Sequence, residues 1–89
     1  MYEVVLSKSA EKELSKLDKF TQKQIITFLE SNVESENPRL QGKTLKHHWA
    51  GHWRYDIGKY RIICDIKDDV CIVLVIKVGH RKEVYRKNR

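Results

Sequence analysis

The sequence is poor in the residues from which disulfide scaffolds, metal sites and membrane spans are built. It has two cysteines, Cys64 and Cys71, and their spacing matches neither a C-x-x-C pair nor a zinc site. We therefore expect unpaired thiols and no metal. The longest uncharged apolar run covers the seven residues 70–76, whereas a membrane-spanning helix needs about 20. No apolar segment follows Met1, so the sequence shows no secretion signal and predicts a cytoplasmic protein.

Proline and glycine are also scarce, and most of them fall in one segment. The single proline, Pro38, and two of the four glycines, Gly42 and Gly51, lie within residues 34–52, which show no sustained periodicity. This segment predicts a long connection that crosses the surface.

Charge, by contrast, is abundant and unevenly placed. The chain is 40% hydrophobic and 34% charged, with a net charge of +6, which predicts a single packed domain over residues 1–89. Residues 1–37 contain five Lys and Arg against seven Asp and Glu, whereas residues 38–89 contain 13 against five. Cations that merely solvate a surface would be spread evenly. The imbalance therefore predicts that the C-terminal part binds an anionic partner, with nucleic acid as the first candidate.

The N-terminal part predicts a strand followed by two helices. Residues 2–6 alternate as a short strand, Ser7 is a helix N-cap for residues 8–17, and Asp18 is an N-cap for residues 20–33. The first helix has an apolar face of Ala10, Leu14 and Leu17. The second has a stripe of Ile26, Leu29 and Val33, widened by Phe20, Ile25 and Phe28.

The C-terminal part predicts sheet. Residues 53–57 and 60–66 form a hairpin, because Gly58 suits the first position of a type II′ turn. With that two-residue turn, Arg54, Asp56 and Arg61 share one face. The opposite, apolar face is the expected seat of the helices; it carries Trp53, Tyr55, Ile57, Tyr60 and Ile62.

A second turn at Asp68 and Asp69 leads into a strand over residues 70–78, but its register stays open. A two-residue loop would place Ile72, Leu74, Ile76 and Val78 on the arginine face, and a β-bulge would reverse them.

Three segments resemble the RelE/ParE superfamily of bacterial toxins, and the tail resembles its RelE branch most: NPRLQGKTLK (37–46), WRYDIGKYRIICDI (53–66) and VGHRKEVYR (78–86). The resemblance spans nearly the whole chain. It implies an α+β RelE-like fold, in which a curved antiparallel sheet packs on an N-terminal helical hairpin and a short helical segment closes the chain.

The same resemblance implies a function. RelE-like members are toxins of type II toxin–antitoxin pairs, and they act as metal-independent endoribonucleases that cut mRNA in the ribosomal A site by 2′-OH attack. The implied partners are a cognate antitoxin, the 70S ribosome and mRNA, with operator DNA bound only through the antitoxin complex; no cofactor is indicated. ParE-like members share the fold but inhibit DNA gyrase, which is the alternative function. A catalytically inactive partner in operon repression is a further alternative.

The motifs assign candidate site residues. Arg61, Arg81 and Tyr85 match the family's functional positions, and Arg54 stands where a basic residue is usual. Two positions depart from the RelE pattern, since Asp56 replaces a second lysine and His80 replaces another.

RNA cleavage by 2′-OH attack needs a base, an acid and a stabiliser of the phosphorane charge. His80 is the candidate base or acid, because imidazole exchanges protons near neutral pH. Arg61 and Arg81 offer planar guanidinium forks for the phosphate. Tyr85 would stack on a base or share proton transfer. Asp56 would either take the 2′-OH proton or pair with a neighbouring arginine.

Several basic residues are candidates for holding RNA: Lys43, Lys46, Lys82, Arg86 and Lys87. Each assignment has a structural alternative. Arg61 also suits a solvated strand position, and Tyr85 suits packing of the tail. Trp49 and Trp53 suit anchoring of the core or a loop, with base stacking as the alternative. His47 and His48 suit solvent or RNA contact. The functional interpretation depends on Arg54, Arg61, His80 and Arg81 converging on one edge of one sheet.

Overall fold

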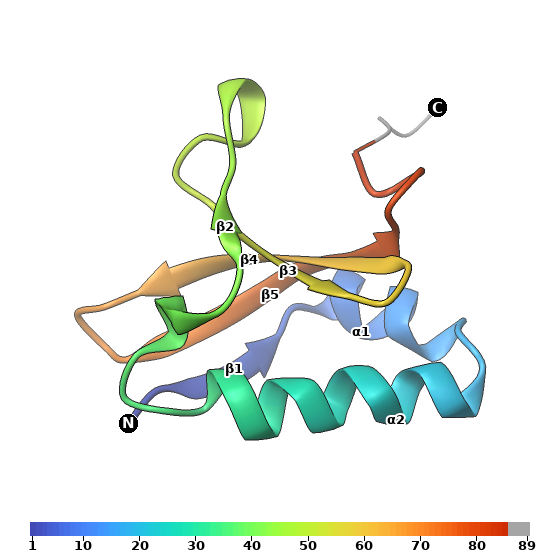
Figure 1. Ribbon diagram of the computed structural model, residues 1–89, viewed down its shortest axis with the longest axis horizontal. Coiled ribbons are helices and arrows are strands. Elements are labelled where there is room, and N and C mark those ends of the chain that lie inside the picture. Colours follow the sequence, from blue (N-terminus) through green and yellow to red (C-terminus); the bar gives the residue numbers. More distant parts are fainter. Residues whose placement is uncertain (86–89) are drawn as a thin grey trace.

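The structure, a computed structural model, describes residues 1–85 and contains a five-stranded sheet with the order β1-β5-β4-β3-β2 (Figure 1). The strands are β1 (Glu3–Leu6), β2 (Lys43–Thr44), β3 (Trp53–Ile57), β4 (Tyr60–Lys67) and β5 (Ile72–His80). β1 pairs with β5 in parallel, and the other pairs are antiparallel. The α+β prediction is confirmed, but the sheet is mixed, because β1 enters beside the last strand of the chain.

Two helices, α1 (Lys8–Ser15) and α2 (Lys19–Phe28), cover one face of the sheet, and α2 continues into a π-helical turn, η1 (Leu29–Val33) (Figure 1). Both predicted caps are present, because the Ser7 hydroxyl accepts from the Ala10 N–H at 3.1 Å and the Asp18 carboxylate accepts from the Thr21 N–H at 2.7 Å. The Thr21 bonds hold the pKa of Asp18 below its ordinary value.

The buried stripe of α2 differs from the prediction at its start. Thr21, Ile25, Leu29 and Val33 are buried, whereas Phe20 is 76% exposed. Successive residues of a helix point about 100° apart. Since Thr21 faces the sheet, its neighbour Phe20 points away from it.

The β3–β4 hairpin has the predicted register. Ile57 pairs with Tyr60 and Asp56 with Arg61, across a two-residue turn in which Gly58 has a φ of 59°. Tyr55 points into the core, where its hydroxyl donates to the Pro38 carbonyl oxygen at 2.6 Å. The arginine face therefore looks away from the helices.

The β4–β5 connection is longer than predicted. Lys67 pairs with Ile72, so residues 68–71 form a four-residue loop instead of a two-residue turn. An irregularity opposite Ile63 and Cys64 leaves Ile76 as an extra residue on β5, and the register shifts there.

This bulge settles the open register, and each alternative holds for part of the strand. Before the bulge, Val73 and Val75 join the core cluster while Ile72 and Leu74 alternate to the other face. After it, Val78 also joins the core cluster.

Residues 34–52 hold more structure than predicted. They contain two 3-10 turns, Pro38–Leu40 and His47–Trp49, and the edge strand β2. The loop around His47–Trp49 and the segment after β5 both rise on the side of the sheet away from the helices (Figure 1). No helix within residues 1–85 is long and apolar enough to cross a membrane.

The segment after β5 makes a single turn. The N–H groups of Glu83 and Val84 both donate to the His80 carbonyl oxygen, at 2.8 and 2.9 Å. Val84 is 2% exposed and lies against Gly79. The predicted C-terminal helical segment is limited to this turn within the described residues, and Arg86 and Lys87 lie outside them.

Candidate functional site

Two arginines and one aspartate are joined on the face of the sheet away from the helices. Asp56 Oδ1 accepts from Arg61 Nε at 3.0 Å, and Asp56 Oδ2 accepts from Arg54 Nη2 at 3.1 Å. The side chains of Arg54 and Arg61 are 17% and 27% exposed, so both guanidinium groups are largely covered. Strand alternation and the tight turn place them together, as the sequence predicts.

Aromatic side chains from two other segments complete this site. Tyr85, in the turn after β5, lies with its ring 5.7 Å from Arg61 Cζ. Trp49 lies edge-on to the Tyr85 ring at 6.2 Å and to the His52 ring at 5.8 Å. His52 and Arg54 alternate onto the same side of the chain. These contacts form a continuous chain, which we name the basic–aromatic cluster; in order it consists of Arg54, Asp56, Arg61, Tyr85, Trp49 and His52.

The cluster contains polar atoms without partners. His52 Nδ1, Arg54 Nε and the Tyr85 hydroxyl are buried and have no hydrogen-bond partner among the described residues. An unsatisfied buried polar group costs about 1–3 kcal/mol. These three atoms include a guanidinium donor and a hydroxyl that both donates and accepts. Their chemistry fits a ligand with phosphate and base groups.

His80 is not part of this cluster. Arg61 pairs with Gly79, so the next residue, His80, pairs with Tyr60, and the two rings lie 5.7 Å apart. Tyr60 packs against the core beneath the sheet. Neighbouring strand residues point to opposite faces. The expected convergence therefore holds for Arg54 and Arg61, and the structure does not bring His80 to them.

Two of the remaining basic candidates, Lys43 and Arg81, lie beside β3 and the β3–β4 turn. Arg81 is exposed, and its N–H donates to the Lys59 carbonyl oxygen at 2.8 Å, beside the β3–β4 turn. Lys43 pairs directly with Arg54 across β2 and β3, so it adds a cation to the same row. Lys46 and Lys82 are exposed.

Comparison with known proteins decides the family. A family model described as the ParE toxin of the type II toxin–antitoxin system parDE matches residues 4–85. The chain belongs to the ParE toxin family. This toxin is 29% identical over 86 residues to toxin RelG of Mycobacterium tuberculosis, which covers 97% of this chain and 98% of RelG.

Solved structures agree with that assignment. The toxin superposes on a chain of the RelBE2 toxin–antitoxin complex of M. tuberculosis with a TM-score of 0.82 and 29% identity, covering 90% of this chain and 98% of the other. For the intact E. coli RelBE complex the TM-score is 0.70 and the identity 22%, with 90% and 96% covered. The predicted RelE-like fold is confirmed, and these relatives agree with the RelE branch of the superfamily.

Two members of the cluster, Trp49 and His52, are not among the candidate site residues of the sequence analysis, and the toxin's sequence contains a signal for one of them. His52, Arg54 and Asp56 alternate with period two, so the polar face of β3 extends one residue before the strand. Trp49 has no comparable signal, because its contact with Tyr85 joins two segments far apart in sequence. Trp53 is a loop anchor, since its Nε1–H donates to the Gln41 carbonyl oxygen at 2.8 Å.

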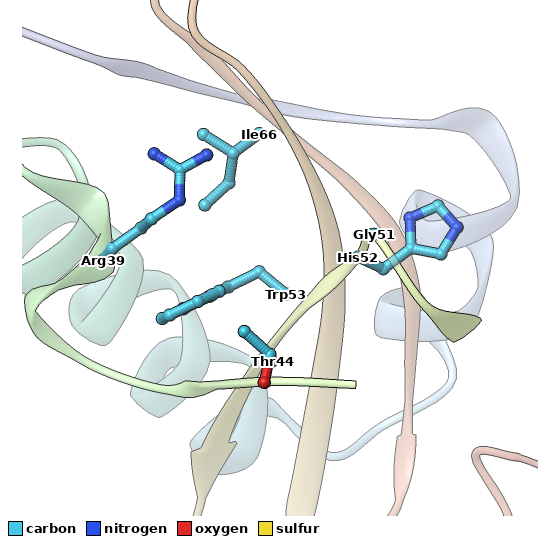
Figure 2. Close-up of a pocket in the computed structure, with 6 residues that line it drawn as sticks. All are labelled: Arg39, Thr44, Gly51, His52, Trp53 and Ile66. Atoms are coloured by element: carbon cyan, nitrogen blue, oxygen red, sulfur yellow. The ribbon is translucent and has the colours of Figure 1, made fainter. Parts of the chain in front are cut away.

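The toxin also has a cavity of about 160 Å³, which shares His52 with the cluster and is lined by Arg39, Thr44, Gly51, His52, Trp53 and Ile66. Figure 2 shows the His52 ring turned away from Arg39 and Trp53. The Arg39 guanidinium is engaged by both Asp68 oxygens at 3.0 Å, which raises the pKa of Arg39 and lowers that of Asp68. In the cavity one arginine is neutralised by one aspartate, whereas in the cluster two arginines share Asp56, so the basic–aromatic cluster is the better candidate for an anionic substrate. Among residues 1–85 no group of three or more His, Cys, Asp or Glu is placed to hold a metal ion.

Proposed function

We propose that this ParE-family toxin is a ribosome-dependent endoribonuclease that cuts mRNA in the ribosomal A site and thereby stops translation. The observation that supports this most is the pair of guanidinium groups held beside an aromatic ring by a shared carboxylate. Such a pair suits a phosphate flanked by a base, because guanidinium groups stay charged and bind phosphate oxygens in a planar fork.

The proposed chemical step balances without a metal ion or a cofactor. The 2′-OH attacks the adjacent phosphorus, the bond to the 5′-oxygen breaks, and the products are a 2′,3′-cyclic phosphate and a 5′-hydroxyl. Arg61 uses Nε for Asp56, which leaves its two terminal nitrogens for the phosphorane oxygens. Arg54 adds a second positive charge, and Arg81 a third from the tail.

Tyr85 is the proposed stacking partner of a substrate base, a contact worth about 1–3 kcal/mol. Its ring already packs against Arg61 and Trp49, so the base would lie next to the bound phosphate. Lys43, Lys46 and Lys82 would hold the RNA backbone in a salt-dependent manner.

His80 is the proposed proton-transfer residue. Its Nδ1 accepts from the Lys82 N–H at 3.1 Å, an assignment that puts the neutral ring's proton on Nε2. Since His80 is the last residue of β5 and lies against Tyr60 on the opposite face, the backbone at the end of β5 would have to change conformation for the ring to reach the arginine side. We expect His80→Gln to lower the cleavage rate by about 10²- to 10⁴-fold. If His80→Gln cleaves at nearly the wild-type rate, His80 is not the proton-transfer residue. His52, whose ring lies in the cluster, would then be the candidate.

A cognate antitoxin is the proposed protein partner. Several relatives of known structure are toxin–antitoxin complexes, among them RelBE2 of M. tuberculosis and RelBE of E. coli. Because α1 and α2 cover the apolar face of the sheet, an antitoxin segment would bind in a groove on the outer side of the helices, where Phe20 is exposed, or by addition of a strand.

The test maps the 5′ ends of cellular mRNA after expression of the toxin. We expect new ends within translated messages and none in a message whose start codon has been removed. Arg61→Ala should abolish the new ends and relieve growth arrest, while the variant still copurifies with its antitoxin. Uncut transcripts in growth-arrested wild-type cells would refute the proposal.

Inhibition of DNA gyrase is the second candidate, favoured by the ParE name of the matching family model. It predicts DNA damage without mRNA cleavage, and growth arrest that survives Arg61→Ala and His80→Ala. The same expression experiment therefore separates the two functions.

A further inference from the structure

Asp56 is the only acidic member of the basic–aromatic cluster, and it touches both arginines. Each carboxylate oxygen accepts one guanidinium bond, Oδ1 from Arg61 at 3.0 Å and Oδ2 from Arg54 at 3.1 Å. We propose that Asp56 is a positioning residue that aims both guanidinium groups at one phosphate and, by its charge, weakens the binding of RNA before reaction. The proposal rests on the proposed ribonuclease function.

The register explains why this carboxylate is needed. Asp56 pairs directly with Arg61, whereas Arg54 pairs with Ile63, so the two arginines are diagonal neighbours on adjacent strands. Diagonal positions in an antiparallel pair lie about 7–8 Å apart, and like charges at that spacing repel. Lys43, which pairs with Arg54 on the other side, adds to this repulsion. Among the described residues, Asp56 is the carboxylate that bonds to both Arg54 and Arg61.

The bonds to Asp56 also decide which donors face a substrate. Arg61 gives Nε to Asp56 and keeps both terminal nitrogens, which form the fork that binds two phosphate oxygens. Arg54 gives one terminal nitrogen. Asp56 thus holds each guanidinium group along one edge, and another edge stays available for phosphate oxygens. A misplacement of about 1 Å in such a group can cost about 10² in rate.

The same carboxylate opposes binding. An amide at position 56 would add one positive charge to the face, and each additional phosphate neutralised steepens the salt dependence for single strands by about 0.7 in log–log slope. Removal of the charge should therefore tighten RNA binding and slow the chemical step. A lower KM together with a lower kcat separates positioning from simple structural support.

The pH–rate profile of an Asp56→Asn variant separates positioning from a role as general base. A base that takes the 2′-OH proton contributes a limb to the pH–rate profile. Both Asp56 oxygens already accept a charged hydrogen bond, so the carboxylate serves to orient the arginines. The profile of an Asp56→Asn variant should keep its wild-type shape at a lower rate.

The experiment compares Asp56→Asn with Asp65→Asn. Asp65 lies on β4, on the same side of the sheet as Arg61, and its Oδ2 accepts from Lys67 Nζ at 3.3 Å. The two substitutions change the net charge equally, so only the contact with the arginines differs. Binding is measured with a short RNA that carries a 2′-deoxy nucleotide at the cleavage position, over a series of salt concentrations. Cleavage is measured on ribosomes programmed with the intact message.

For Asp56→Asn we expect binding two- to tenfold tighter at low salt and kcat lowered by about 10- to 100-fold, the range set by misaligned groups. Asp65→Asn should change both by less than about twofold, because a solvated surface pair contributes little. The Nε–H NMR signal of Arg61, protected by the carboxylate in the wild type, should exchange rapidly in Asp56→Asn. Thermal unfolding confirms that each variant folds.

Three results would overturn the proposal: wild-type cleavage by Asp56→Asn, unchanged RNA affinity, or loss of a limb of the pH profile. If the wild-type toxin leaves RNA uncut on programmed ribosomes, the proposed ribonuclease function fails. If the wild-type toxin cuts RNA and Asp56→Asn cuts it equally well, only the proposal for Asp56 fails.

Discussion

Replacement of Arg61 by lysine keeps the positive charge and removes the guanidinium fork. In the structure Arg61 gives one nitrogen to Asp56 and has two terminal nitrogens left. A lysine ammonium cannot bond to Asp56 and also present a two-nitrogen fork to the phosphate. At least one charged hydrogen bond to the phosphorane is therefore lost. Such a bond is worth about 1.5–3 kcal/mol. At 1.36 kcal/mol per factor of ten, kcat should fall by about 10- to 150-fold.

Arg39 provides the matched control. It too is bonded to an aspartate, Asp68, and its Cζ lies 6.0 Å from the centroid of the Trp53 ring, close to the 5.7 Å between Arg61 and Tyr85. Arg39→Lys therefore makes the same chemical change outside the cluster. We expect it to leave cleavage within about twofold, as is usual for exposed pairs.

The assay is single-turnover cleavage of mRNA on programmed ribosomes at saturating toxin, which reports kcat separately from binding. If Arg61→Lys cleaves within threefold of the wild type, the fork is not the group that stabilises the phosphorane. Equal losses in the Arg61 and Arg39 variants would show that a general effect of arginine removal had been measured.

Three further predictions concern the scaffold. Tyr55→Phe leaves a buried carbonyl oxygen unsatisfied and should lower the free energy of unfolding by about 1–3 kcal/mol in chemical denaturation, with cleavage retained. Gly42→Ala should destabilise more than Gly51→Ala in the same measurement: both glycines have a positive φ, but only at position 42 would the added Cβ collide with neighbouring atoms. Because bonds from Arg39 lower the folded-state pKa of Asp68, their stabilising effect is present above about pH 4 and is lost as pH falls through that lowered pKa. Asp68→Asn should therefore make acid unfolding less steep, and an unchanged acid limb would contradict this.

The elements that the sequence predicted well are those decided by near neighbours. The two helix caps depend on a side chain and an N–H three residues away, and the β3–β4 hairpin depends on Gly58 in a two-residue turn. That turn is enough to place Arg54 and Arg61 on one face.

The failed and open predictions involve longer-range effects. The bulge at Ile76 reversed the face of the end of β5, and with it the side on which His80 lies, because every side chain beyond an inserted residue changes face. The two-residue strand β2 carries too few residues to show alternation, so it was assigned to an irregular connection.

By itself the sequence determined the two helices, the β3–β4 hairpin, the shared face of the two arginines and the family motifs, since these depend on residues close together in the chain. Only the tertiary structure decided that Trp49, His52 and Tyr85 meet the arginines and that His80 lies against Tyr60. Those contacts join a loop, a strand end and a tail, and their geometry depends on sheet register and packing that no local pattern encodes.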